Sequence, residues 1–344
     1  MATITPSPRT NDGSAYVGAQ LLVRLHGQPI GEVQLPLRYG IVQADHLARA
    51  LTAELSEEVQ GHLAADGRSF YPPVTPSGAD PQGGPRPCTW SARLAGLGVG
   101  RPFVSVVLAT CRRPKRLTRT LHTLAAQTYP EMEVLVVDNC PSVPGAQAAI
   151  DAVQDSRIRR LEEPVPGASR ARNAGLRAAC GEVVAFTDDD VDVDVDWLGN
   201  LVTPFYEDPG TACVTGLILP TSLETPAERT IEEFGGFSKG FVPRTFAITD
   251  TGHGPMYPYN AGLFGSGACA AFRRRPFLAL GGFSADLGPA TVARGGEDLD
   301  AYLSVLYAGH RLRYAPAAVV RHEHRRDPNQ LAKQVYGYGI GLSA

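Results

Sequence analysis

The sequence predicts an α/β fold with a parallel sheet, preceded by a small α+β module. From residue 102 onwards, short apolar segments typical of buried strands alternate with amphipathic helical segments. This order is typical of strands joined by right-handed helical crossovers. Residues 67–101 are rich in proline and glycine and predict a linker between the two parts. A chain of 344 residues can hold one large domain, residues 102–330, together with such an appendage.

The N-terminal module is predicted at residues 15–66. The preceding residues, 1–14, are polar and rich in Pro, Ser and Thr, which indicates a disordered tail. Residues 19–36 have the pattern of a β-hairpin with its turn at 27–29. A helix beginning near Asp45 is predicted from an apolar stripe at i, i+4 spacing, formed by Leu47, Leu51, Leu55, Val59 and Leu63. The module contains no chemical motif, and its role is left open.

Three strands of the main domain follow from their apolar content. They are predicted at residues 104–109, 134–137 and 183–186. A helix is expected to begin at Pro114, which suits the first helical position, and a second spans residues 168–179. A further helix is predicted to begin near Glu297, and residues 331–344 are expected to form a helical tail. The strands and helices therefore alternate as the α/β class requires.

Polar side chains follow each of the three strands at its carboxyl end. These clusters are residues 110–113, 138–139 and 188–190. Because parallel strands end at the same edge of a sheet, and ligands bind beyond that edge, the clusters are expected to converge on one site. Asp188, Asp189 and Asp190 are three adjacent carboxylates, and hard oxygen ligands favour Mg²⁺ or Mn²⁺. The alternative is a solvated acidic turn.

Composition narrows the classes of function. The net charge of −3 provides no electrostatic basis for binding nucleic acid. Six cysteines stand singly, with no CxxC pair, which argues against a disulfide framework or a zinc site and for a reducing compartment. No leader and no apolar run of about 18 residues is evident, so the chain is expected to be cytoplasmic without a membrane span. Peripheral membrane contact through Arg311, Arg313 and the tail is left open.

Six ordered motifs resemble those of glycosyltransferase family 2. They are residues 104–114, 134–139, 169–175, 186–190, 265–273 and 295–298, within the range 102–326. The resemblance implies the GT-A fold, a mixed and mainly parallel sheet with flanking helices. It also implies an inverting enzyme that uses Mn²⁺ or Mg²⁺ to move a sugar from a UDP- or dTDP-sugar to an acceptor hydroxyl. The acceptor, whether a glycan, a lipid-linked molecule or a small molecule, is not specified.

The same resemblance assigns the residues of the donor site. Asp188 would contact the ribose and the metal, Asp190 would bind the metal, and Asp189 occupies the variable middle position among the nucleotide-sugar contacts. His322 stands where relatives supply a third metal ligand, with His324 as the alternative. Residues near the nucleotide would be Thr110 and Arg112 at the base pocket, Asp138 at the base or ribose, and Arg172 and Asn173 at a helix start, where free N–H groups favour anions. For Arg172 and Asn173, the alternative is helix capping and an ion pair with a surface carboxylate.

The general base is expected in the acidic pair that follows Gly295 and Gly296. The resemblance favours Asp298 as the group that takes the proton from the acceptor hydroxyl, with Glu297 as the second candidate. A sugar-phosphate nucleotidyltransferase is an alternative, but it would want a glycine-rich loop after the first strand, and residues 110–114 contain no glycine. The other alternative is a non-catalytic sugar-nucleotide-binding or scaffold module, against which the intact acidic residues and His322 argue.

Overall fold

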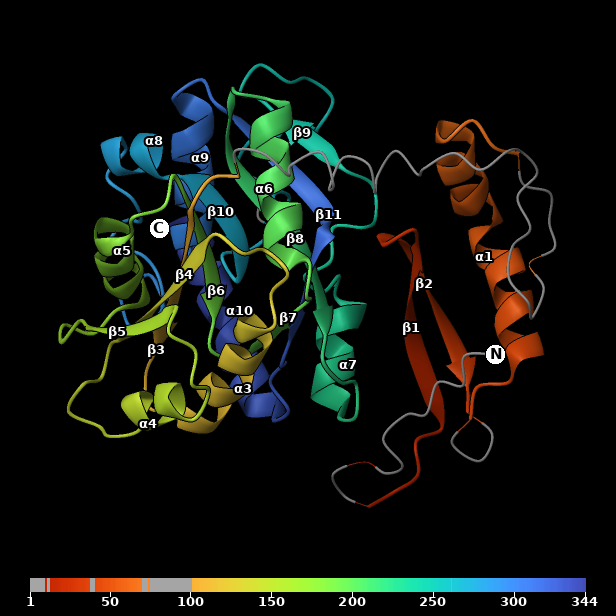
Figure 1. Ribbon diagram of the computed structural model, residues 1–344, viewed down its shortest axis with the longest axis horizontal. Coiled ribbons are helices and arrows are strands. Elements are labelled where there is room, and N and C mark those ends of the chain that lie inside the picture. The colour runs from red at the N-terminus through yellow and green to blue at the C-terminus, as the bar shows by residue number, and fades with distance from the viewer. Residues whose placement is uncertain (1–9, 11–12, 38–40, 70–73, 75–100, 261) are drawn as a thin grey trace. The chain divides into compact units, whose positions relative to one another are not determined.

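The computed structural model describes residues 10, 13–37, 41–69, 74, 101–260 and 262–344. The chain divides into two units (Figure 1), residues 1–98 with 240–242, and residues 99–239 with 243–344. Most of the predicted tail, 1–14, and most of the predicted linker, 67–101, lie outside the described residues.

The first unit is a two-stranded sheet and a helix. Strands β1 (Gly18–Leu25) and β2 (Gln28–Pro36) are antiparallel. His26 and Gly27 form the turn with φ angles of 53° and 88°, which suits the right-handed twist of a two-residue hairpin. Helix α1 (Ala44–Ala65) buries Leu55, Val59 and Leu63. The predicted hairpin and helix are confirmed, with the turn one residue earlier than expected.

The second unit is built on one sheet of nine strands among the described residues. Their order is β5-β4-β3-β6-β10-β8-β11-β7, and β9 pairs with β11. Strands β3 to β6 and the pair β8–β11 are parallel where they adjoin, whereas β10, β7 and β9 run antiparallel to their neighbours. The bounds are β3 Val104–Thr110, β4 Met132–Asp138, β5 Ile158–Glu162, β6 Val183–Asp188, β7 Val191–Val193, β8 Thr211–Pro220, β9 Arg244–Phe246, β10 Cys269–Arg273 and β11 Arg311–His322.

Helices cover both faces of this sheet, so each face has its own core. Along β3, Val106 and Leu108 pack in one core with α3 and α6, whereas Val107 packs in the other with α5, α8 and α9. This alternation is the period of two expected of a strand buried on both faces. The helices are α3 Pro114–Ala125, α4 Ala146–Asp151, α5 Ala168–Ala178, α6 Trp197–Glu207, α7 Pro226–Glu233, α8 Arg274–Ala279, α9 Glu297–Tyr307 and α10 Pro328–Ser343.

Several helices and strands were predicted from the sequence, and several others were not. The three predicted strands correspond to β3, β4 and β6, and the predicted helices to α3, α5 and α9. Strands β5, β8 and β10 were not predicted, although β8 is buried at every residue. Among the described helices, none is both long enough and apolar enough to cross a bilayer.

Helix α10 contains the predicted C-terminal tail and packs closely on the second unit. A Cβ atom at Gly341 would lie 2.4 Å from the carbonyl carbon of Gly295 and 2.7 Å from the nitrogen of Gly296. Such contacts between backbones require glycine. Since Gly296 is the N-cap of α9, α10 supports the beginning of that helix.

Candidate active site

The strand ends bring the predicted polar clusters together. In the sheet register Thr110 lies opposite Asp138, and Ala109 lies opposite Asp188. Pairing of β7 with β11 places Val191 opposite His322, which brings this histidine beside Asp190. The predicted convergence at the carboxyl ends of β3, β4 and β6 is therefore confirmed, and β11 adds a fourth element to this edge.

Asp190 lies at the centre of a cationic cluster. Its carboxylate Oδ2 is 3.1 Å from Arg113 Nη1, 3.4 Å from Arg325 Nη1 and 3.6 Å from Arg116 Nη1. Its other oxygen, Oδ1, is 3.5 Å from His322 Nε2. Arg113 also pairs with Asp189 and Arg116 with Glu323, so the cluster is close to charge balance. Its guanidinium groups are nevertheless of the type that binds phosphate oxygens.

His322 also contacts a second histidine, His324, which in turn contacts Glu232. Its Nδ1 lies 3.2 Å from His324 Nδ1, and His324 Nε2 lies 2.7 Å from Glu232 Oε1. Burial lowers the pKa of His322 despite the opposing effect of Asp190, so the imidazole is neutral near pH 7. Neutral imidazole and carboxylate are the forms that bind metal. The facing atoms of Asp190 and His322 therefore suit a divalent cation such as Mn²⁺.

Asp189 points toward the end of β3. Its Oδ2 accepts a hydrogen bond of 2.7 Å from Thr110 Oγ1, and its Oδ1 accepts one of 3.1 Å from Arg113 Nη1. Burial raises the pKa of Asp189 to about 6, although Arg113 acts in the opposite direction. The carboxylate thus joins β6 to β3 and orients the arginine that also contacts Asp190. This placement favours a bracing role for Asp189 over direct contact with a nucleotide.

Arg172 connects the two acidic segments of the site, residues 188–190 and 297–298. Its Nη2 donates to Asp188 Oδ1 at 3.0 Å, and its Nη1 donates to Glu297 Oε1 at 3.0 Å. The guanidinium also lies over the ring of Phe283, 5.5 Å from its centroid. Burial alone would lower the pKa of Arg172, but Asp188, Asp298 and Glu297 outweigh it and raise the pKa. Arg172 is a buried ion-pair partner of carboxylates within the site, whereas the alternative interpretation of the sequence expected helix capping and a surface carboxylate.

Asp298 is held by the backbone of the segment before β10. Its Oδ2 accepts a 2.7 Å hydrogen bond from the N–H of Gly267. Its Oδ1 is buried without a hydrogen-bond partner among the described residues, 3.7 Å from Arg172 Nη1. A Cβ atom at Gly267 would lie 2.4 Å from Oδ1, so any larger residue here would displace the carboxylate. One oxygen is thus fixed by the backbone, and the other has no hydrogen bond to the described residues.

Glu297 is more enclosed than Asp298. Its side chain is 9% exposed, against 26% for Asp298. Burial and the neighbouring Asp298 raise the pKa of Glu297, while Arg172 acts to lower it. Its contact with Arg172 gives it a structural partner, so the geometry favours Asp298 as the group that meets an acceptor.

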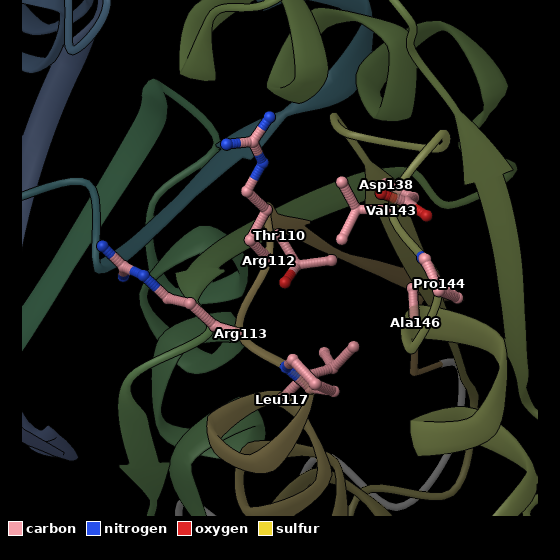
Figure 2. A pocket seen from close by; sticks show the side chains of 9 residues that line it. Thr110, Arg112, Arg113, Leu117, Asp138, Val143, Pro144 and Ala146 are labelled. Carbon is pink, nitrogen blue, oxygen red and sulfur yellow. The ribbon is translucent and has the colours of Figure 1, made fainter.

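A hollow beside the cationic cluster lies where the base pocket was predicted. The hollow is shallow and open, and Figure 2 shows Arg112 and Arg113 extending from one side while Asp138 and Val143 lie on the other. Its lining residues are Thr110, Arg112, Arg113, Pro114, Leu117, Asp138, Val143, Pro144 and Ala146. The mixture of aliphatic walls and a few polar groups suits a planar nucleobase.

Asp138 is braced by a residue that sequence reasoning missed. Arg160 on β5 donates to Asp138 Oδ2 from Nη2 at 2.7 Å and from Nε at 3.2 Å. The N–H of Cys140 donates to Oδ1 at 3.0 Å. In sequence the segment is mostly charged, Ile-Arg-Arg-Leu-Glu at residues 158–162, and it was not recognised as a strand. Asp138 nonetheless lines the hollow as predicted.

A disulfide joins Cys111 and Cys140, contrary to the expectation that the cysteines do not pair. The two residues follow the ends of neighbouring strands, so the sheet brings their Cα atoms to 5.1 Å although 29 residues separate them in sequence. Free cysteines in the described part of the chain are Cys180, Cys213 and Cys269. The absence of a CxxC pair therefore did not exclude a disulfide. The argument for a reducing compartment, which depended on it, loses its basis.

Asn173 lies beside the site but is bonded to the backbone. Its Nδ2 donates to the carbonyl of Phe283 at 2.7 Å, and its Oδ1 accepts from the N–H of Phe283 at 2.9 Å. These bonds favour a bracing role, which positions the ring of Phe283 under Arg172. Arg112, in contrast, is exposed, with a φ of 60°, and is free to meet a ligand through its backbone or side chain.

Comparison with known proteins identifies similar chains. The model of the family described as Glycosyl transferase family 2 matches residues 105–281, just over half of the chain. Glucosyl-dolichyl phosphate glucuronosyltransferase of Haloferax volcanii is 27% identical over 197 residues, which cover 54% of this chain and 57% of that protein. The succinoglycan biosynthesis protein ExoM of Rhizobium meliloti is 29% identical over 248 residues, 69% of this chain and 72% of that protein.

A solved structure gives a further comparison. The mannosyltransferase PcManGT from Pyrobaculum calidifontis, in complex with GDP-Man and Mn²⁺, aligns with a TM-score of 0.48 at 23% identity. The alignment covers 67% of this chain and 59% of that chain.

Proposed function

The chain belongs to glycosyltransferase family 2, and on that premise we propose that it is an inverting, metal-dependent transferase. In this proposal a sugar moves from a UDP- or dTDP-sugar to an acceptor hydroxyl by a single displacement. The observation that carries it is the convergence of Asp190, three arginines and His322 at the sheet edge, with Asp298 connected to that edge through Arg172.

The donor would lie across the ends of β3, β4 and β6. Its base would enter the hollow between Thr110 and Asp138, supported by the backbone at Arg112. Its diphosphate would meet Arg113, Arg116 and Arg325, which converge on Asp190. Arginine suits this role because its planar fork matches phosphate oxygens. The convergence of these three guanidinium groups at the sheet edge supports this orientation of the donor.

Mn²⁺ or Mg²⁺ would be held by Asp190 and His322, with Asp188 as a third ligand. The facing Oδ1 of Asp190 and Nε2 of His322 support the first two assignments. Asp188 is bonded to Arg172, and a ligand role would require its carboxylate to use the oxygen that this arginine leaves open. When bound, the cation would act as a Lewis acid that stabilises negative charge on the departing nucleoside diphosphate.

Asp298 would act as the general base. It takes the proton from the acceptor hydroxyl while that oxygen forms its bond to the anomeric carbon and the bond to the diphosphate oxygen breaks. The partly exposed carboxylate, held by Gly267 and with Oδ1 not hydrogen-bonded, supports this role. A positioned base contributes about 10²–10⁴-fold in rate. One base and no second nucleophile is the arrangement that single displacement needs, and the acceptor would approach from the side of α9.

Calorimetry tests the donor site. The protein is titrated with UDP, dTDP and GDP, with and without Mn²⁺, and Asp190→Ala is compared with Asp192→Ala. Asp192 is a suitable control because it pairs with Arg119 on the exterior. We expect metal-dependent binding of one nucleotide, lost in Asp190→Ala and kept in Asp192→Ala. Absence of binding under every condition would contradict the proposed donor site.

The rival functions differ in what they do to a bound donor. A transferase slowly releases the nucleoside diphosphate from its sugar-nucleotide, with water as the acceptor. A binding or scaffold module releases none, and a nucleotidyltransferase releases pyrophosphate from a nucleoside triphosphate and a sugar phosphate. Measurement of the released product, with metal present, therefore distinguishes the three.

A further inference from the structure

The first unit contains a cluster of two histidines and an aspartate that the proposed transferase reaction does not use. His26 lies in the turn between β1 and β2, His62 lies in the last turn of α1, and Asp66 is the C-cap of that helix. Because His62 and Asp66 are four residues apart, they lie on the same side of the helix end. The hairpin turn places His26 against them.

The three facing atoms have separations suited to one cation. His26 Nδ1 is 3.0 Å from His62 Nε2, and Asp66 Oδ2 is 3.7 Å from the first and 3.8 Å from the second. A point equidistant from three atoms with these separations lies about 2 Å from each, which is the length of zinc–nitrogen and zinc–carboxylate bonds. A cation there would need no large movement of the three side chains.

The surroundings of the cluster also favour positive charge. The Asp66 side chain is 1% exposed and its carboxylate lies at the C-terminus of α1, where the helix dipole attracts cations. His62 is 7% exposed and His26 is 31% exposed, so the cluster opens to solvent on the His26 side.

We propose that His26, His62 and Asp66 form a binding site for Zn²⁺ that links the hairpin turn to the end of α1. Two imidazoles and one carboxylate favour zinc or a similar transition metal over Mg²⁺ and Ca²⁺, which prefer oxygen ligands. A two-stranded hairpin on one helix gains little stability from its own packing. A metal that joins their ends would stabilise this unit, because binding energy at such a site contributes to folding.

Metal titration of the full chain tests the site. The protein, prepared without a polyhistidine tag and freed of metal with chelator, is titrated with Zn²⁺ by calorimetry and with Co²⁺ by visible absorption. We expect one equivalent that involves this cluster and binding at least about tenfold weaker in His62→Gln. His46→Gln, at the other end of α1, is the matched control and should bind as the unaltered protein does.

The His26→Asn variant is a second test, chosen because it should lose a metal ligand without misfolding. Asparagine tolerates the positive φ at position 26, and Asn-Gly is a favoured pair for a two-residue hairpin turn, so the fold should persist while the ligand is lost. We expect this variant to lose the zinc equivalent and the rise in melting temperature that zinc produces. Unchanged binding in His26→Asn and His62→Gln, or an equivalent lost only in His322→Gln, would overturn the proposal. So would the absence of zinc binding to the unaltered protein.

Discussion

The two acidic runs of the candidate active site, residues 188–190 and 297–298, have different electrostatic surroundings. The first follows a strand and is contacted by Arg113, Arg116, Arg172 and Arg325. The second begins a helix, and Arg172 is the only arginine that pairs with it among the described residues. A run surrounded by cations suits the binding of a diphosphate and a metal, whereas a base must not have its carboxylate fully occupied by cations.

The two runs also share a feature. In each, one carboxylate is committed to the fold and a neighbour is left for the ligand. Asp189 is bonded to Thr110 and Arg113, and Glu297 is bonded to Arg172. Adjacent residues of the same charge thus have separate tasks because their side chains leave the backbone in different directions. The predictions below test this division, beginning with the largest effect.

Removal of the proposed base should have the largest effect on activity. In Asp298→Asn the side chain can still accept the hydrogen bond from Gly267 but cannot take a proton, so we expect kcat to fall about 10²–10⁴-fold. Nucleotide affinity should be unchanged, because the donor site lies on the other run. Nucleoside diphosphate release and calorimetry measure the two quantities. Asp300→Asn, on the same helix turn, is the control, and an unchanged kcat in Asp298→Asn would assign the base elsewhere.

Removal of the arginine between the runs should reduce stability most. Arg172→Met leaves Glu297 buried without its cation, and loss of one partner of a buried pair costs about 3–5 kcal/mol of unfolding free energy. Burial already raises the pKa of Glu297 and Arg172 opposes this effect, so the variant should raise it further. A raised pKa in the folded state makes stability fall as pH increases through it.

The destabilisation by Arg172→Met should therefore be greater at pH 8 than at pH 5, as denaturant unfolding at the two pH values would measure. Arg170→Met, two residues away and exposed, is the control and should change stability by less than about 0.5 kcal/mol. Equal destabilisation at both pH values would indicate that Glu297 does not take up the proton.

Loss of the packing of α10 against the start of α9, which carries residues 297–298, should have an intermediate effect on stability. Gly341→Ala would press a methyl group against the backbone of Gly295 and Gly296, and overpacking of this kind costs about 1–3 kcal/mol. It should also lower kcat by displacing the beginning of α9. In contrast, Gly339→Ala meets open space and should raise stability by about 0.5–1 kcal/mol through the helix propensity of alanine. Similar melting temperatures for the two variants would refute the packing argument.

Removal of the hydrogen bond that holds Asp189, in the first run, should have the smallest effect on stability. Thr110→Val removes the hydroxyl that donates to Asp189, whose other oxygen keeps its bond to Arg113. We expect a loss of about 1 kcal/mol in unfolding free energy, measured by denaturant titration. Thr118→Val removes a hydroxyl from an exposed bond on α3 and should cost less. If Asp189 instead contacts the nucleotide, Thr110→Val will weaken nucleotide binding more than it weakens the fold.

Sequence alone determined the fold class and the position of the site. Apolar runs of strand length end at Thr110, Asp138 and Asp188, and parallel strands must end at one edge, so the meeting of these residues follows from periodicity and chain order. The place of Asp298 at the beginning of a helix was likewise predicted, because an acidic pair after two glycines has the pattern of a helix start. Of the strands missed, β8 and β10 have apolar residues at both parities, a pattern that by itself does not distinguish a buried strand from a buried helix.

Only the tertiary structure decided which carboxylate meets which cation. Asp188, Asp189 and Asp190 lie where a strand ends, and beyond the last strand residue the period of two no longer fixes side-chain direction. Their partners come from distant parts of the chain: Arg113 is 76 residues from Asp189, and Arg325 is 135 residues from Asp190. The same holds for Arg172 with Glu297, 125 residues apart, and for Cys111 with Cys140. Such pairs arise from the order of strands in the sheet and the packing of helices on its faces, which local sequence pattern does not specify.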